Sequence, residues 1–382
     1  MARIVLGSYM VRYPLGGMLS WVLQYIIGFQ KLGHEIYFVE KFGYENACYH
    51  PIKEEMSNDC AYGLQVLKEL LKPFGLENNW CFVQYGDLYH GLSKTKVEEI
   101  FRTADLFIDM GSHGSWAEES EGCQMRVLID GEPAFTQIKM SHRLEAGEQL
   151  SGYDHYFTNG MLVGTDASSS PTASKNWKHV LHPVNAGLFE VQPPPKNAAF
   201  STVMNWRSHA PIQYKGKTFG QKDLEFEKII ELPNQTSAPL EIAVSGKKLP
   251  LELLKSFGWQ IEDGRAMTLS YERFKRYILD SYAELTVCKQ VFVANRTGWF
   301  SDRSSAYLAS GRPVILQDTG YSDFLPVGEG LFAFTTSDEA LTAIDEIRGN
   351  HAKHSKKARE IACDLLDAKW VLKEFCHELG IS

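Results

Sequence analysis

The order of apolar and polar positions near the N-terminus is typical of a βαβ unit. Arg3–Gly7 is a short apolar run that predicts a buried strand, and Met18–Leu32 is apolar at helical spacing and ends before Gly33. Glu35–Val39 is a second apolar run of strand length. Because a strand, a helix and a strand in this order form a right-handed crossover, the pattern predicts a parallel sheet.

The same alternation continues through the first half of the chain and then stops at a proline run. Val191–Lys196 contains three consecutive prolines, which favour a stiff, extended connection between folded units. The other elements predicted before this run are two helices, Tyr62–Leu71 and Lys94–Arg102, and four strands, Asp105–Asp109, Arg126–Asp130, Tyr156–Thr158 and His179–Leu181.

A second α/β series follows the prolines. Its predicted strands are Phe200–Met204, Leu240–Val244, Val291–Val293 and Pro313–Leu316, and its predicted helices are Asp223–Glu231, Leu251–Phe257, Tyr271–Leu279 and Asp302–Ser310. We therefore expect an α/β fold of two doubly wound, Rossmann-like domains. Their expected bounds are 1–190 and 198–350, with a hinge at 191–197 and closing helices over 351–382.

Composition narrows the class of protein. The 382 residues are 44% hydrophobic and 23% charged, as in globular proteins, and the net charge of -8 argues against nucleic acid as a partner. The seven cysteines are scattered without metal-ligand spacing, which predicts reduced thiols. The chain lacks a signal-peptide pattern and its apolar stretches are interrupted, so we expect a cytoplasmic protein without a transmembrane segment. Nothing in the sequence indicates an oligomeric state.

Two loops of the first half carry candidate chemistry. Gly16 and Gly17 at the start of a helix would let its amides approach an anion, or would only shape the turn. His113 follows a predicted strand, and its near-neutral pKa suits a general base, although a loop histidine can also have no role. Asp130 and Glu132 follow the next strand, where they would assist the base, accept a hydroxyl proton or bind a sugar, or would only cap a helix.

The strongest candidate site lies at the start of the helix predicted over Asp302–Ser310. Free amides and hydroxyl groups would converge there on a phosphate, with an arginine to add charge. Capping alone would explain Ser301 and Asp302 but not the grouping of Arg303 with Trp299 and Phe300, so we favour a binding site. The residues of this site are Ser301, Asp302, Arg303 and Ser304. Asn205, Arg207 and Lys289 lie beside other strands of this half and would complete a donor-binding site.

The stretch Gly298–Ile315 resembles the donor domain of nucleotide-sugar glycosyltransferases with the GT-B architecture. A helix of small residues followed by Gly-x-Pro-Val is a mark of that family, and Ala309–Val314 matches it. The resemblance implies two Rossmann-like domains facing across a cleft, the nucleotide sugar on the C-terminal domain, and closing helices packed back on the N-terminal domain. It also implies that the loop at Gly16 and Gly17 borders the donor phosphates.

One feature departs from the large retaining group of that family. Its paired glutamates would stand at Gly298 and Ala306 of this chain, so both carboxylates are absent. The retaining mechanism therefore does not carry over, and the chain resembles a divergent family.

These observations predict a glycosyltransferase that moves a sugar from a nucleotide-diphosphate sugar to an acceptor that the sequence does not identify. His113 or Asp130 would act on the acceptor. Because no DxD motif is present, we expect amides and basic residues, rather than a metal, to stabilise the departing diphosphate, and we expect no cofactor. The alternatives are a nucleotide-sugar epimerase and a non-catalytic nucleotide-sugar binding protein.

Overall fold

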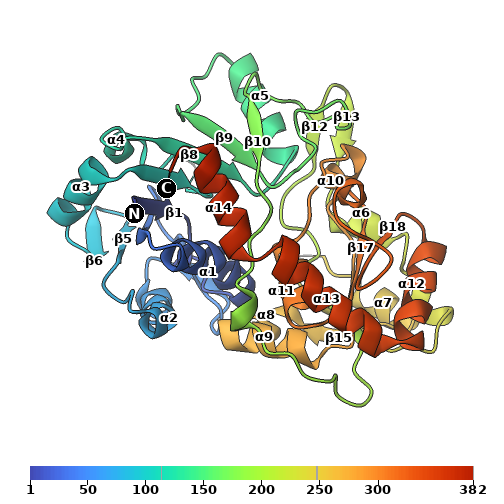
Figure 1. Cartoon of the computed structure of the whole chain (residues 1–382). Coiled ribbons are helices and arrows are strands. Elements are labelled where there is room, and N and C mark those ends of the chain that lie inside the picture. Colours follow the sequence, from blue (N-terminus) through green and yellow to red (C-terminus); the bar gives the residue numbers. More distant parts are fainter. Residues whose placement is uncertain (113, 247, 382) are drawn as a thin grey trace.

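The computed structural model describes residues 1–112, 114–246 and 248–381. It contains two large sheets, one on each side of the proline run (Figure 1). We call residues 1–190 the N-half and residues 198–350 the C-half. In order across the sheet, the N-half strands are β10 (Trp177–His179), β9 (His155–Thr158), β8 (Arg126–Asp130), β7 (Leu106–Asp109), β1 (Arg3–Gly7), β2 (Glu35–Lys41), β5 (Trp80–Gln84) and β6 (Leu88–Gly91).

The C-half sheet has six strands. In order they are β15 (Gln260–Asp263), β14 (Leu240–Ser245), β11 (Phe200–Asn205), β16 (Ala283–Thr286), β17 (Val314–Gln317) and β18 (Leu331–Phe334). Every strand pairing in the two sheets is parallel except that of β5 with β6, among the residues described. Both sheets are doubly wound, because the chain order reverses between β1 and β7 and again between β11 and β16.

Helices cover the sheets and join the two halves (Figure 1). Those of the N-half are α1 (Gly16–Lys31), α2 (Ala61–Leu71), α3 (Lys94–Thr103), α4 (Ala117–Ser120) and α5 (Phe135–Glu145). Those of the C-half are α6 (Lys222–Phe226), α7 (Leu251–Ser256), α8 (Gly264–Met267), α9 (Tyr271–Asp280), α10 (Gln290–Ala294), α11 (Asp302–Ala309) and α12 (Ser337–Gly349). Two antiparallel hairpins add β3 (Cys48–His50) with β4 (Glu55–Ser57), and β12 (Ile212–Tyr214) with β13 (Lys217–Phe219).

Of the two closing helices, α14 (Ala368–Glu378) packs on the N-half as the resemblance implied. Helix α13 (His351–Leu365) packs mainly on the C-half instead, where His354 Nδ1 accepts the N–H of Gly330 at 3.3 Å. Helix α14 packs on α1 so closely that a Cβ atom at Gly28 would lie 2.4 Å from Leu372 Cδ1. Phe375 lies 6.0 Å from Phe29, between ring centroids. Side chains of α1, α9, α11 and α14 belong to one continuous hydrophobic core, so the two halves are held together by apolar packing.

The connection between the halves is fixed at one point. Arg312 is fully buried, and its guanidinium donates to the carbonyl oxygens of Gln192 at 2.9 Å and Leu279 at 3.2 Å. The start of the proline run is thus held against the C-half, while its action as a hinge and the exact domain bounds stay predictions.

One predicted strand is wrong. Val291–Val293 lies in helix α10, and Val291 and Phe292 are buried in the core. A short apolar run does not distinguish a strand from a buried helical turn by its periodicity, and the true strand, β16, precedes it. The helix predicted over Asp223–Glu231 is also shorter, because α6 ends at Phe226. Among the described helices, none is long and apolar enough to cross a membrane.

Candidate functional site

The two points where strand order reverses define the candidate site, because ligands of doubly wound sheets bind at the carboxyl ends of the strands there. Loops that follow strands of both halves meet at this place. Leu162 donates its N–H to the carbonyl oxygen of Thr297 at 3.0 Å, and Gly160 forms an antiparallel bridge with Trp299. The carboxyl ends of β8 and β9 therefore face loops that follow β16.

Glu40, at the end of β2, holds the loop between β1 and α1. Its buried carboxylate accepts the backbone N–H groups of Met10 at 2.8 Å, Val11 at 2.7 Å and Arg12 at 3.0 Å. Burial raises the pKa of Glu40 to about 7, although the three N–H groups favour the charged form. This carboxylate is therefore used inside the protein to shape the loop.

The two glycines that start α1 differ in their surroundings. Gly16 donates its N–H to the carbonyl oxygen of Thr268 at 2.6 Å, and a Cβ atom there would lie 2.5 Å from the carbonyl oxygen of Ser270. Gly16 thus permits close packing of α1 against the C-half. A Cβ atom at Gly17 would meet no atom within 4 Å, so Gly17 borders open space.

The N-half residues predicted to be catalytic have different environments. His113 lies outside the described residues. Asp130 is buried and accepts hydrogen bonds from Gln137 Nε2 at 2.8 Å, Thr158 Oγ1 at 2.9 Å and the N–H of Glu132 at 2.9 Å. Burial raises the pKa of Asp130. With both oxygens occupied, Asp130 fixes the turn that presents Glu132.

Glu132 forms an ion pair with the C-half. Both of its carboxylate oxygens lie 2.5 Å from Lys289 Nζ. The Lys289 side chain is 9% exposed and that of Glu132 is 38% exposed. The structure thus brings together one predicted catalytic residue and one predicted donor-binding residue, from opposite halves.

The start of α11 has the arrangement expected for an anion site. Ser301 is the N-cap residue with an extended backbone, and its hydroxyl makes no capping hydrogen bond. Ser304 is fully buried, and its Oγ atom has no hydrogen-bond partner among the described residues. Asp302 lies in the first turn of α11. Burial lowers the pKa of His182 in the N-half, and the negative charge of Asp302 opposes this change, which places the two residues near each other.

Arg303 does not have the free guanidinium that the sequence suggests. Its Nε atom lies 2.5 Å from Glu284 Oε1, while Nη1 donates to the Val203 carbonyl oxygen and Nη2 to Thr286 Oγ1, both at 3.1 Å. Glu284 is fully buried, so Arg303 compensates a carboxylate inside the C-half.

Asn205 and Arg207 are also engaged outside the central cluster. Asn205 Oδ1 accepts from Ser245 Oγ at 2.8 Å, and Arg207 Nε lies 2.6 Å from Asp223 Oδ2. The Arg207 side chain is largely exposed. Within the described residues, neither side chain forms a hydrogen bond or ion pair with Lys289 or with the start of α11.

Lys222, the first residue of α6, is a basic residue that sequence reasoning missed. It is only 8% exposed, and no hydrogen bond or ion pair engages its ammonium group within the described part of the chain. Its pKa is lowered to about 7, mainly by burial and also by the nearby positive charges of Arg303 and Lys289, while Cys288 and Glu284 act in the opposite direction. No local pattern marks this lysine, because its burial depends on strands and helices far away in the sequence.

Several other buried polar atoms at these facing loops have no partner in the described residues. Buried polar groups are nearly always hydrogen-bonded, so each such atom needs an explanation, and a bound ligand or water supplies one. On the C-half they are both amide atoms of Gln221, Glu284 Oε2 and Ser304 Oγ; around the contact between the halves they are Trp21 Nε1, Asn159 Oδ1, His182 Nδ1 and Trp299 Nε1.

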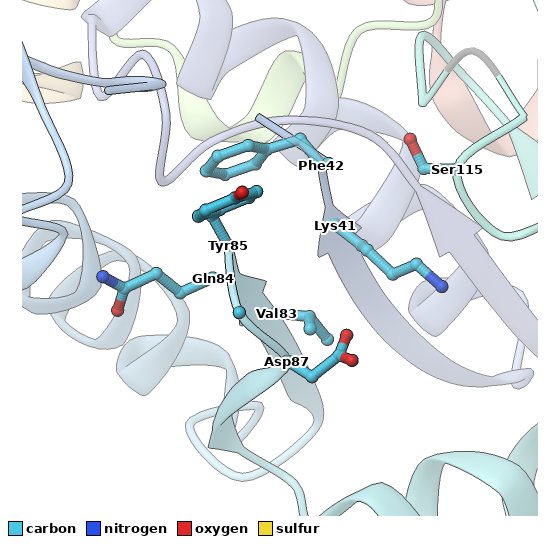
Figure 2. Close-up of a pocket in the computed structure, with 9 residues that line it drawn as sticks. Lys41, Phe42, Val83, Gln84, Tyr85, Asp87 and Ser115 are labelled. Carbon is cyan, nitrogen blue, oxygen red and sulfur yellow. The ribbon is translucent and has the colours of Figure 1, made fainter. Parts of the chain in front are cut away.

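A hollow of about 510 Å³ lies at the carboxyl ends of β2 and β5. Figure 2 shows the rings of Phe42 and Tyr85 at one side of it and the polar ends of Lys41 and Asp87 at the other. Tyr85 is 47% exposed. The hollow has the size of a small-molecule site and lies on the same edge of the sheet as Glu132.

No protein-family model matches the chain, and no curated protein matches it. Solved structures do match it. A structure of α-glucosyltransferase with UDP and a 13-mer DNA containing a central A:G mismatch is 11% identical, covers 100% of both chains and has a TM-score of 0.61. Anabaena Alr3699/HepE with UDP-glucose is 13% identical, also covers 100% of both chains and has a TM-score of 0.59. The whole chain therefore has the fold of these glycosyltransferases, which confirms the predicted GT-B fold class.

The described residues contain no group of three or more His, Cys, Asp and Glu side chains placed to hold a metal ion. The cations that the site does offer are Lys222 and Lys289.

Proposed function

We propose that this protein is a glycosyltransferase that moves a sugar from a nucleotide-diphosphate sugar, the donor, to an acceptor nucleophile. The observation that carries the proposal is Lys222, a nearly buried lysine whose ammonium group has no hydrogen bond or ion pair among the described residues, although the charge of Glu284 favours its protonated form. Such burial costs free energy that a bound anion would recover. The fold shared with proteins that bind UDP or UDP-glucose supports a nucleotide diphosphate as that anion.

In this proposal the donor phosphates lie at the start of α11. Lys222 and Lys289 supply the charge, and Ser304 Oγ and the free amides of the first turn supply hydrogen bonds. Gly17 leaves room for the donor on the side of the N-half. The sugar lies beside Asp302, near the unpaired nitrogen atoms of Trp21, His182 and Trp299.

The transfer needs three events. The acceptor oxygen forms a bond to the anomeric carbon, the bond from that carbon to the diphosphate oxygen breaks, and its electron pair leaves with the diphosphate. The acceptor proton passes to a base on the N-half, for which Glu132 and His113 are the candidates. Lys222 and Lys289 stabilise the negative charge that develops on the diphosphate.

The hollow beside Tyr85 and Phe42 is proposed to bind the part of the acceptor that does not react. The acceptor itself is not identified. The structures that share this fold include α-glucosyltransferase complexes with DNA, so the fold gives no support to the exclusion of nucleic acid that net charge suggested.

Calorimetric titration with UDP-, GDP-, TDP- and ADP-glucose tests the proposal. One of these donors is expected to bind at a one-to-one ratio, and failure of all four to bind would contradict it. Incubation of that donor alone distinguishes the alternatives: an epimerase converts the donor sugar without an acceptor, and a non-catalytic binder leaves it intact with every acceptor offered.

A further inference from the structure

The ion pair between Glu132 and Lys289 is placed where the proposed donor would need one of its partners. Lys289 Nζ lies 2.5 Å from both carboxylate oxygens, so the carboxylate binds the ammonium group much as two phosphate oxygens would. Lys289 is almost buried, whereas Glu132 is more than one third exposed. The lysine is thus fixed in the C-half, and the glutamate is the partner that can leave.

The surrounding charges favour an exchange of one anion for another. The positive charge of Lys289 helps to lower the pKa of Lys222, so the two lysines lie near each other, and Arg303 is already paired with Glu284. Glu132 is thus paired with Lys289 alone, while Lys222 has no ion pair among the described residues. A diphosphate brings more negative charge than one carboxylate and can engage both ammonium groups together.

We propose that Glu132 is an internal competitor of the donor diphosphate at Lys289, and that donor binding releases its carboxylate to act on the acceptor. This inference rests on the proposed function. In the absence of a donor both carboxylate oxygens are engaged by Lys289. Once the diphosphate occupies Lys289, the carboxylate stands beside a second anion, which favours uptake of the acceptor proton.

Two consequences follow from this exchange. The donor binds before the acceptor is activated, because the same event that fills the phosphate site frees the base. The contact between the halves also changes from a direct ion pair to one made through the donor, since Glu132 follows β8 and Lys289 follows β16.

The experiment measures the affinity for inorganic pyrophosphate, which carries the diphosphate group of every nucleotide sugar, at one fixed pH. The variants are Glu132→Gln, Lys289→Met and the two combined. Glu132→Gln is expected to tighten pyrophosphate binding about tenfold. This change in affinity lies between the free-energy contribution of an exposed ion pair and that of a buried one. In the Lys289→Met background, Glu132→Gln is expected to change the affinity little, because the competition needs the lysine.

Glu35→Gln is the matched control. Glu35 belongs to the same half as Glu132, and its side chain is 36% exposed and paired with Arg3 at 2.7 Å. It begins β2 and so lies at the amino end of that strand, away from the carboxyl ends where the site lies. Its replacement is expected to leave pyrophosphate affinity unchanged. If Glu132→Gln binds pyrophosphate as well as the wild type does, or more weakly, Glu132 does not compete with the diphosphate at Lys289. The proposed phosphate site would stand in that case. Absence of pyrophosphate binding by both overturns the phosphate site and with it the proposed function.

Discussion

Replacing Lys222 by methionine is expected to stabilise the fold and to weaken donor binding. Methionine keeps most of the aliphatic length of lysine and removes the charge that burial disfavours. The pKa of Lys222 is lowered from 10.5 to about 7. Between these two pH values the folded state therefore binds fewer protons than the unfolded state. The free energy by which Lys222 destabilises the fold becomes smaller as the pH rises through that interval.

The magnitude follows from the same shift. Lowering the pKa from 10.5 to about 7 corresponds to about 5 kcal/mol of unfavourable burial at pH 6, where the amine is charged in both states. At pH 9 the folded amine is neutral, and about 2 kcal/mol remains as the cost of removing the proton on folding. The stabilising effect of Lys222→Met should therefore shrink by about 3 kcal/mol between pH 6 and pH 9.

Urea unfolding of the wild type and Lys222→Met at both pH values measures this difference. Lys255→Met is the control, since Lys255 is exposed on α7. The reasoning is refuted if Lys222→Met is less stable than the wild type at pH 6, or if the difference between the two proteins is the same at pH 6 and pH 9. A variant that is more stable but binds the donor less well would show that the buried charge is kept for function.

Three further predictions concern single side chains. Arg303→Met should lower the free energy of unfolding by about 3–5 kcal/mol, because it leaves the buried carboxylate of Glu284 without a partner. A variant that stays stable but has lost donor binding would show instead that Arg303 binds the donor phosphates. Tyr85→Ala should raise the KM for the acceptor and leave donor affinity unchanged in steady-state kinetics. An unchanged acceptor KM would show that the hollow does not bind the acceptor. Glu132→Gln should lower kcat by about 10²–10⁴-fold, because it removes the proposed base, whereas a small effect there and a large one in His113→Ala would assign that role to His113.

Local patterns predicted much of the fold. The strand Arg3–Gly7, the helix that follows it and the helix at Asp302 were predicted from apolar periodicity and flanking glycines, and the structure confirms them. The strand Val291–Val293 was wrong because a buried helical turn shows the same run of apolar residues.

The candidate site was only partly predictable, since the partners of its charges come from distant segments. The sequence shows Arg303 beside a helix start, but its pairing with Glu284 depends on how α11 packs on β16. Lys222 has no local mark at all, and its burial follows from the surrounding fold. By contrast, Glu132 follows the predicted strand Arg126–Asp130, and the rule that ligands bind at strand carboxyl ends selects it. Lys289 was chosen because it precedes the strand predicted at Val291–Val293, whereas in the structure it precedes helix α10 and follows β16.

The donor diphosphate is proposed to bind the ammonium group of Lys222. Calorimetric titration with a nucleotide sugar at pH 8, in two buffers of different ionisation enthalpy, measures the protons taken up on binding. The diphosphate of a nucleotide sugar does not titrate near this pH, so uptake reports on the protein.

With a pKa of about 7, free Lys222 is mostly neutral at pH 8, and a bound anion raises that pKa. The account predicts uptake of up to about 0.9 proton per donor bound by the wild type, and loss of that uptake in Lys222→Met. Donor binding without proton uptake, or the same uptake in Lys222→Met, would contradict it.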